Sequence, residues 1–308
     1  IRKNIPYWKR MSKVEMRIPV DGEKNEAVNT ESSLKKKTAR FSKKETEFLL
    51  TKVNRTLNAK IQEVLISSLM IAMKRWTHGQ NIKIDIEGHG REAIRRGINL
   101  SRTVGWFTTL FPFSVKLQER SSLLEDVNEI IRAMQSIPDN GIEFGVLKYL
   151  RGVAFEEHPS EVSFNYLGQI NTTFENSIFE IADESVEPIR DSAAPRAYLL
   201  DVEGAVYNGE LSLDWMYSSH LHKDETIELL VSEFCSIVRE IIKLGMDFEG
   251  KLYLPKNFNK VNLNETEWEL INQHTATIED MYPLSPVQEG ILFHTLMHPE
   301  TGIYMEQM

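Results

Sequence analysis

The sequence lacks the features that mark secreted and membrane-spanning proteins. Its 308 residues include one cysteine, Cys235, so no disulfide can form within the chain. No apolar run approaches the roughly 18 residues that cross a bilayer, and no charged start followed by an apolar stretch indicates a signal peptide. These absences exclude a disulfide-stabilised secreted scaffold and a membrane span, and they predict a cytoplasmic location.

Several signatures of catalysis are also missing. The sequence has no nucleophile elbow, no phosphate-binding glycine loop and no dinucleotide fingerprint. His78, His220 and His222 have no metal-like partners at suitable spacing, and Cys235 has no second thiol. We therefore expect no metal site and no directly bound cofactor, and we interpret Cys235 as a packing residue.

The composition is that of a globular protein, with 41% hydrophobic and 26% charged residues and a net charge of −9. Residues 1–60 carry 16 basic and 7 acidic side chains, so the remainder is strongly acidic. A run of basic residues between Lys35 and Lys44 contains a single aromatic residue, Phe41, and no glycine-rich binding module follows it, which argues against nucleic-acid binding. The polar stretch 21–37 is predicted to be a surface loop.

Local patterns predict four helices. Capping boxes open two of them at Ser42 and Ser122, an apolar stripe spans Ile61–Trp76, and a last helix runs from Asp224 to a C-terminal cap at Gly245. Alternation predicts strands over Ile82–Ile86 and Val162–Tyr166 and a hairpin over Ala197–Tyr217, with its turn at Asn208-Gly209. The fold class is therefore α/β with a mixed sheet.

One short segment concentrates reactive side chains. Residues 87–92 read Glu-Gly-His-Gly-Arg-Glu, and Glu87 directly follows a predicted strand. A partly desolvated glutamate at a strand end can have its pKa raised toward neutrality and act as a general base. The alternative is a solvated turn in which Arg91 and Glu92 pair on the surface.

Two further segments combine polar and aromatic groups. Arg102 and Trp106 belong to Arg-Thr-Val-Gly-Trp-Phe-Thr at 102–108, and Asn165 and Tyr166 belong to Phe-Asn-Tyr-Leu-Gly-Gln at 164–169. Amide and phenol groups at a strand end can orient a substrate carbonyl. Core packing of the aromatics and satisfaction of buried backbone groups are the structural alternatives.

These three segments together resemble successive motifs of the epimerization domains of nonribosomal peptide synthetases, in the same order and at similar spacing. The resemblance covers residues 1 to about 245. A fourth, shorter motif is similar to residues 138–145, although Glu143 and Phe144 stand where the family usually has glycine and tyrosine. That departure affects the expected geometry of the loop.

The resemblance implies a chloramphenicol acetyltransferase-like fold, in which two subdomains form a V around a tunnel. The chain would contain mainly the second subdomain, because the His-His-x-x-x-Asp-Gly motif of the first occurs nowhere in it. We therefore expect a fragment, and we expect this fragment alone to be inactive.

The activity implied is inversion of an L-aminoacyl or peptidyl thioester to the D-form. The substrate arrives on the 4'-phosphopantetheine of an upstream peptidyl carrier protein domain. Glu87 matches the family's catalytic glutamate, and Asn165 and Tyr166 match residues that line the site. The resemblance assigns a substrate-binding role, in shaping the tunnel, to four more residues: His89, Arg91, Arg102 and Trp106. The alternatives are a condensation domain that forms peptide bonds and a non-catalytic interaction fragment.

The end of the chain resembles the start of a second domain. Residues 246–278 lose periodicity and contain many asparagines, which predicts a linker with one short helix at residues 265–272. Residues 282–294, which begin Tyr-Pro-Leu-Ser-Pro, resemble the opening motif of a condensation domain. We accordingly predict an epimerization domain part at 1–245, a linker at 246–278 and the start of a downstream condensation domain at 279–308.

Overall fold

The computed structural model divides the chain into two compact units, residues 1–248 and residues 249–308. Its described residues in the first unit are 2–22, 29–92, 100, 102–170 and 190–247. In the second unit they are 261, 263, 267, 270, 271, 278 and 281–297. Within these residues no helix has the length and apolar character that crossing a membrane requires.

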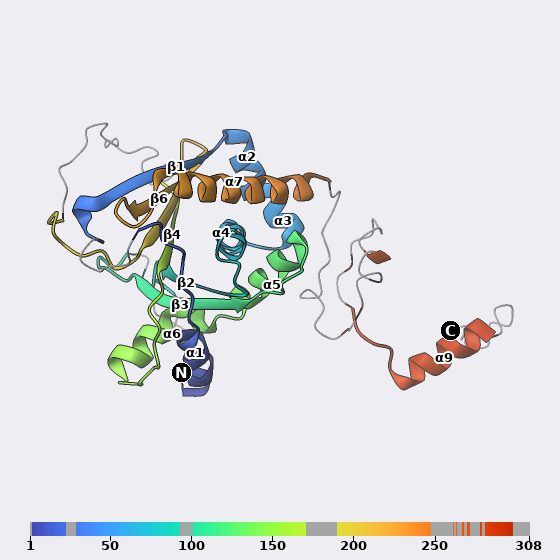
Figure 1. The fold of residues 1–308 in the computed structure, drawn as a ribbon. Coiled ribbons are helices and arrows are strands. Elements are labelled where there is room, and N and C mark those ends of the chain that lie inside the picture. Colours follow the sequence, from blue (N-terminus) through green and yellow to red (C-terminus); the bar gives the residue numbers. More distant parts are fainter. Residues whose placement is uncertain are drawn as a thin grey trace. The chain divides into compact units, whose positions relative to one another are not determined.

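A six-stranded mixed sheet forms the centre of the first unit (Figure 1). Its spatial order is β1-β6-β5-β4-β2-β3, where β4 pairs in parallel with β2 and β5 and the other pairs are antiparallel. The strands are β1 (Leu34–Phe41), β2 (Asn81–Gly88), β3 (Thr109–Lys116), β4 (Val162–Gln169), β5 (Leu200–Tyr207) and β6 (Glu210–Ser218). The predicted mixed sheet is confirmed, including the hairpin, whose turn at Asn208 has φ +50°.

The helices surround this sheet and include all four that the sequence predicts. The α-helices of the first unit are α1 (Ile5–Lys13), α2 (Lys43–Phe48), α3 (Asn54–Leu57), α4 (Ile61–Thr77), α5 (Leu123–Gln135), α6 (Ile142–Gly145) and α7 (Asp224–Asp247). Ser42 and Ser122 form the expected capping boxes of α2 and α5, because each hydroxyl accepts from the backbone N–H three residues on. His78 ends α4 in the left-handed conformation.

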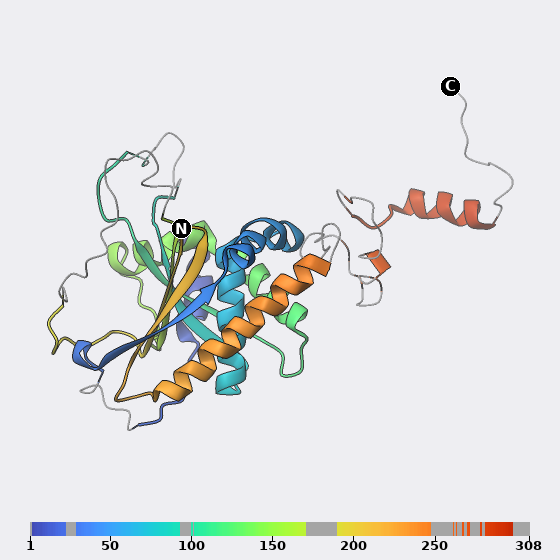
Figure 2. The ribbon, with the colours of Figure 1, turned by 90° about the horizontal axis from the view of Figure 1, so that it is seen from above.

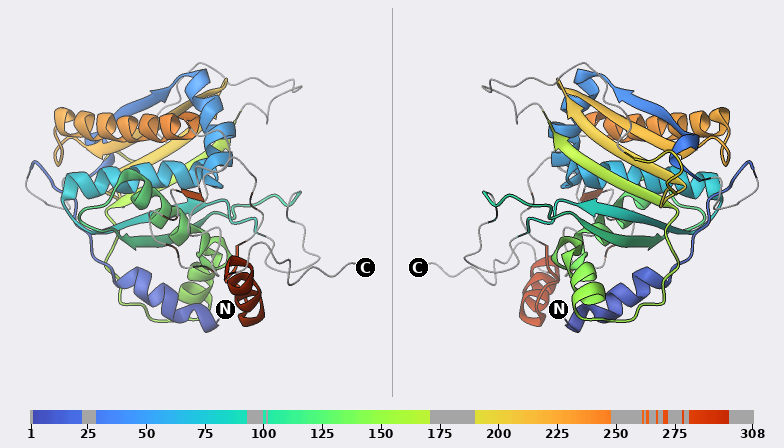
Figure 3. Two further views of the ribbon diagram at one scale, coloured as in Figure 1. Left: turned by 90° about the vertical axis from the view of Figure 1, so that its right-hand side faces the viewer. Right: turned by 90° about the vertical axis from the view of Figure 1, so that its left-hand side faces the viewer.

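The two faces of the sheet differ in what lies on them. Helices α4 and α7 both cover one face of the sheet, as Figure 2 shows. In Figure 3 they lie in front of the sheet in the left view and behind it in the right view. Alternate residues on this side are fully buried, among them Ile84, Phe113, Phe164 and Trp215. We call this the apolar face and the opposite side, which carries Glu87, the polar face.

Four features of the first unit depart from the sequence prediction. Residues 34–37, expected in a loop, begin the edge strand β1, and their lysines pair with acids brought from β6 and α7. Strand β3 and helix α1 were not predicted. Gly245 lies inside α7 and does not cap it; a Cβ there would come within 3.0 Å of Val53, so glycine permits close packing.

In the second unit, α9 (Pro286–Met297) follows Ser285, whose hydroxyl accepts from the backbone N–H of Gln288. Apolar side chains on α9, including Phe293 and Leu296, are exposed. The predicted short helix at residues 265–272 lies largely outside the described residues. The proposed boundaries at 245 and 278 stay predictions.

Candidate active site

Glu87 and the Asn165–Tyr166 pair lie side by side at one edge of the sheet. Glu87 is the penultimate residue of β2, and the parallel pairing of Ile86 with Phe164 places Asn165 beside it on β4. The ends of these two parallel strands border a cavity of about 680 Å³, which we call the strand-end cavity. His89, Arg91 and Trp106 line the same cavity, together with residues at the start of α4.

The Glu87 side chain has the surroundings of a base. It is partly buried, and none of the hydrogen bonds or ion pairs between described residues involves its carboxylate. Burial raises the pKa of Glu87 above its ordinary value, and the negative charge of Glu203 raises that pKa further. A carboxylate that is unpaired and hard to ionise has a high affinity for a proton.

Asn165 and Tyr166 reach the cavity from opposite faces of the sheet because successive strand residues alternate. Asn165 shares the polar face with Glu87, whereas Tyr166 lies on the apolar side. The Tyr166 hydroxyl is buried and has no hydrogen-bond partner among the described residues, and burial raises its pKa, so the group is a neutral donor. Gly204 on β5 lies beside the Tyr166 ring, and a Cβ there would come closest to Leu213 Cγ, at 3.2 Å.

Arg91 acts on the loop that follows it. Its guanidinium donates to the carbonyl oxygens of Leu100, Thr103 and Gly105 at 2.7, 2.8 and 3.2 Å, and it stacks 4.4 Å from the centre of the Phe107 ring. The alternative of an Arg91–Glu92 surface pair is therefore wrong. Arg91 instead fixes the backbone of the loop at the mouth of the cavity.

Glu92 is tied to other partners. Its carboxylate lies 3.2 Å from His89 Nε2 and accepts a 2.8 Å hydrogen bond from Asn140 Nδ2. Gly90 has φ +65°, and a Cβ there would lie 1.6 Å from the Phe107 carbonyl oxygen, so only glycine fits. The Glu87–Glu92 segment is thus a packed loop that holds the cavity wall.

Trp106 and Arg102 differ in position. Trp106 is 90% exposed and lines the cavity from its outer rim. Arg102 is exposed and does not belong to the described lining of the strand-end cavity. The role that the resemblance gives to Arg102 therefore stays a prediction.

The two departures from the fourth motif have partners at the start of the chain. Glu143 is buried and accepts a 2.7 Å hydrogen bond from Asn4 Nδ2. The Phe144 ring packs against Trp8 of α1, with 5.5 Å between ring centres. Both side chains therefore anchor α6 to the first residues of the unit.

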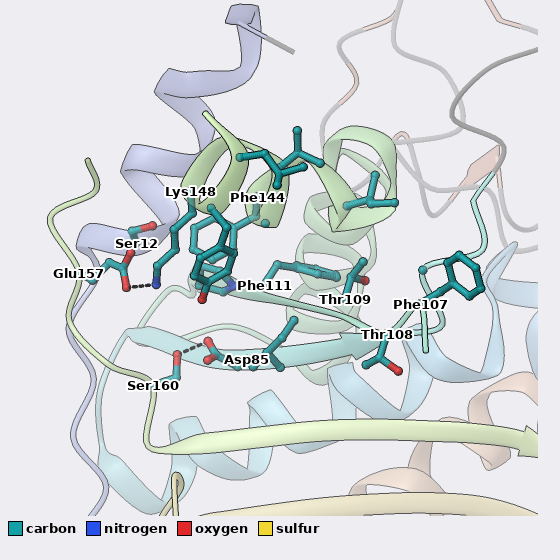
Figure 4. Close-up of a pocket in the computed structure, with 18 of the residues that line it drawn as sticks. Ser12, Asp85, Phe107, Thr108, Thr109, Phe111, Phe144, Lys148, Glu157 and Ser160 are labelled. Carbon is teal, nitrogen blue, oxygen red and sulfur yellow. Dashed lines mark hydrogen bonds and ion pairs between the residues drawn. The ribbon is translucent and has the colours of Figure 1, made fainter. Parts of the chain in front are cut away.

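A second cavity of about 670 Å³ lies near the edge strand β3 (Figure 4). Its polar groups are mutually satisfied: Lys148 donates to Glu157 at 2.6 Å, and Ser160 donates to Asp85. Aromatic rings such as Phe144 form its wall. Because these polar groups already have hydrogen-bond partners, we assign the candidate chemistry to the strand-end cavity.

A third cavity of about 420 Å³ lies on the polar face, and Glu87 and Asn165 line it as well. It contains Glu203 and Asp201 of β5, which no sequence motif singles out. The signal for them was the alternation of acidic and apolar residues along β5. Among the described residues no cluster of His, Cys, Asp and Glu could hold a metal ion.

Comparison with known proteins gives the context of this site. Residues 1–264 match the family model described as "Condensation domain". The chain is 32% identical to a protein of the linear gramicidin synthase of Brevibacillus parabrevis, over 100% of this chain and 4% of that protein. It is 29% identical to bacitracin synthase 1 of Bacillus licheniformis, over 99% of this chain and 6% of that protein. The chain thus spans a small part of each relative.

Among solved structures, the epimerization domain from the third module of tyrocidine synthetase B matches with a TM-score of 0.72 and 26% identity. The match covers 80% of this chain and 56% of that one. It confirms the chloramphenicol acetyltransferase-like α/β fold that the resemblance implied. The chain belongs to the condensation domain family of nonribosomal peptide synthetases, whose members act on substrates carried on phosphopantetheine.

Proposed function

We propose that this chain carries part of an epimerization site, in which Glu87 removes the α-proton of an aminoacyl or peptidyl thioester. The observation that carries the proposal is the partly buried Glu87 carboxylate beside Asn165 at the strand-end cavity, which has no bonding partner among the described residues. The identity of 26% to an epimerization domain supports the same assignment.

The chemistry follows from the thioester. Its α-proton is acidic because the carbanion that remains is delocalised as an enolate, so a positioned base is sufficient to remove the proton. Glu87 accepts that proton and becomes a neutral carboxylic acid. Asn165 and Tyr166 can donate hydrogen bonds to the carbonyl oxygen, where negative charge develops. The D-form results when the α-carbon takes up a proton on its opposite face. A group from the family's histidine motif, which this sequence lacks, would stand opposite Glu87 to supply that proton, or would steady the enolate.

The proposal extends to partners. The substrate would arrive on the 4'-phosphopantetheine of an upstream peptidyl carrier protein domain, and a downstream condensation domain would accept the D-product. The complete polypeptide would make a peptide secondary metabolite such as an antibiotic. Peptide-bond formation by residues 1–245 is the alternative that the family description leaves open.

The test uses the complete synthetase, loaded with an L-aminoacyl carrier in deuterated water. Glu87→Gln should slow α-deuterium uptake and D-product formation by about 100-fold or more, the scale of a positioned acid or base. Glu92→Gln, a matched change in the same motif, should lose much less because its carboxylate only bonds His89 and Asn140. Unchanged uptake in Glu87→Gln would eliminate Glu87 as the base.

The same assay separates the alternatives. An intact protein that forms peptide bonds but exchanges no α-proton would be a condensation domain. The 308-residue chain by itself should show no epimerization above background, because the histidine motif is missing from it. Activity of the isolated chain would contradict the two-subdomain site.

A further inference from the structure

One row of residues crosses the polar face of the sheet and joins Glu87 to a second glutamate. Glu87 is followed across the sheet by Asn165, and the strand register then pairs Asn165 with Glu203 and Glu203 with Asp214. Neighbouring strands lie about 4.8 Å apart, so the backbones of Glu87 and Glu203 are about 10 Å apart. Two glutamate side chains on the same face can span much of that distance above Asn165.

The other acids of this surface are neutralised locally. Asp214 accepts from Thr38 Oγ1 at 2.6 Å and from Lys36 Nζ at 3.0 Å. Asp201 accepts from Ser163 Oγ at 2.6 Å and pairs with Arg196.

Glu87 and Glu203 have no such partner within the described part of the chain, although both line the 420 Å³ cavity. The negative charge of Glu203 therefore acts on Glu87, and neither carboxylate is bonded to a described cation.

The described cations nearest Glu203 are bonded to other acids. Burial raises the pKa of Glu203 above its ordinary value of 4.5, and Asp214 and Asp201 raise it further. Lys36 opposes them but is already bonded to Asp214. The two arginines at this cavity are occupied as well, since Arg190 pairs with Glu31 and Arg196 with Asp201.

We propose that Glu203 is a positioning residue of the epimerization site: its negative charge, held one strand beyond Asn165, strengthens Glu87 as a base. The inference rests on the function proposed above. When Glu87 takes the substrate α-proton, its carboxylate becomes a neutral acid and the repulsion with Glu203 ends. Proton uptake by Glu87 is therefore more favourable than it would be beside a neutral residue. Glu203 stands at an exposed position of β5 and is only partly desolvated, so solvent screens its charge and limits the effect.

The experiment compares Glu203→Gln with Glu203→Asp and with a matched control, Glu210→Gln, in the complete synthetase. Glu210 lies at the exposed start of the same hairpin's second strand, so its substitution removes an equal charge away from the site. The first readout is the pH profile of α-deuterium exchange. Glu203→Gln should move the acid limb to lower pH and reduce the plateau about two- to fivefold, the scale of charge pairs near a surface. Glu203→Asp should retain part of the effect, and Glu210→Gln should match the wild type.

The second readout does not depend on catalysis. Carbodiimide labelling of Glu87, followed by mass spectrometry across a pH series, reports how readily its carboxyl group is protonated. Glu203→Gln should move the midpoint of labelling to lower pH. If neither profile moves while Glu87 is still required for exchange, the inference is wrong and the proposed function stands.

Two other outcomes are decisive. A shifted labelling midpoint in a protein that exchanges no α-proton would support the coupling of the two glutamates and refute the proposed function. A loss of exchange with an unchanged pH profile would overturn the inference, because it would show that Glu203 has a merely structural role.

Discussion

The two faces of the central sheet are made by the same strands but have different roles. On β4, Phe164 is fully buried under the helices of the apolar face, whereas the next residue, Asn165, borders two cavities. On β2, Ile86 and Glu87 show the same division. Alternation along a strand therefore lets one residue stabilise the fold while its neighbour is available for chemistry, at a separation of one position.

The polar face is also where the structure tolerates unfavourable electrostatics. Burial and neighbouring carboxylates raise the pKa of both Glu87 and Glu203, which means that folding disfavours their charged forms. Proteins commonly concentrate such groups at functional sites, because the perturbation serves catalysis and not stability.

The largest expected effect is a loss of stability caused by a substitution on the apolar face. Phe164→Ala should lower the free energy of unfolding by about 3–5 kcal/mol, because it leaves a cavity in a closely packed core. Urea denaturation of the 308-residue chain, followed by circular dichroism, measures this loss. A loss below about 1 kcal/mol, the typical effect of a point mutation, would show that Phe164 is not a core residue.

The adjacent position should behave in the opposite way. Asn165→Ala should change the free energy of unfolding by less than about 0.5 kcal/mol, as is usual for residues outside a packed core. In the complete synthetase it should slow α-deuterium exchange about 100-fold, the scale of one lost donor to a developing oxyanion. Equal losses of unfolding free energy at positions 164 and 165 would show that the two faces do not differ in their contribution to stability.

Tyr166 tests the boundary between the two faces. Its buried hydroxyl has no partner among the described residues, so Tyr166→Phe should leave the free energy of unfolding within about 1 kcal/mol of the wild type. Exchange in the complete synthetase should fall about tenfold if the hydroxyl contacts the thioester oxygen. A stability loss larger than that limit would reveal a structural hydrogen bond in place of a substrate contact.

The smallest effect concerns the acids of the polar face. Folding raises the pKa of Glu203 above its unfolded value of 4.5. The stability that this raised pKa gives the folded state is fully present below pH 4.5, and it is lost as the pH rises through the pKa of the folded state. Glu203→Gln should therefore stabilise the chain at neutral pH by less than about 1 kcal/mol, since the residue is exposed to solvent.

The gain should disappear in acid, where the wild-type side chain is also neutral. Unfolding curves at neutral pH and below pH 4.5 measure the difference, and Glu210→Gln, at an exposed position, should show no such pH dependence. A gain that persists in acid would point to a cause other than charge.

Several elements can be predicted because their signals are local. The serines at 42 and 122 cap helices through contacts three residues away, and Asn208 turns the hairpin through its own backbone conformation. The alternation of isoleucines over β2 is sufficient to place Glu87 at the end of a strand. The motifs that carry the resemblance to epimerization domains are likewise contiguous.

The elements that escape prediction depend on distant partners. Strand β1 carries three consecutive lysines, a pattern typical of a loop, but it forms a strand because its backbone pairs with β6 along its whole length and Phe41 is buried. Asp214, Asp224 and Glu228 pair with those lysines from elsewhere in the chain. Arg91, the surface partner of Glu92 in one interpretation, instead binds three backbone carbonyls. Its predicted role in shaping the tunnel stays a prediction.

The sequence by itself determined that Glu87 ends a strand, that Asn165 and Tyr166 lie together on another strand, and which family the chain resembles. Only the tertiary structure decided that β2 and β4 are adjacent and parallel, and that Glu203 lies one strand beyond Asn165. The physical reason is that strand identity follows from residues two positions apart, whereas strand pairing joins residues about 40 to 80 positions apart. Until that pairing is known, an acidic residue on β5 cannot be distinguished from one on any solvated strand.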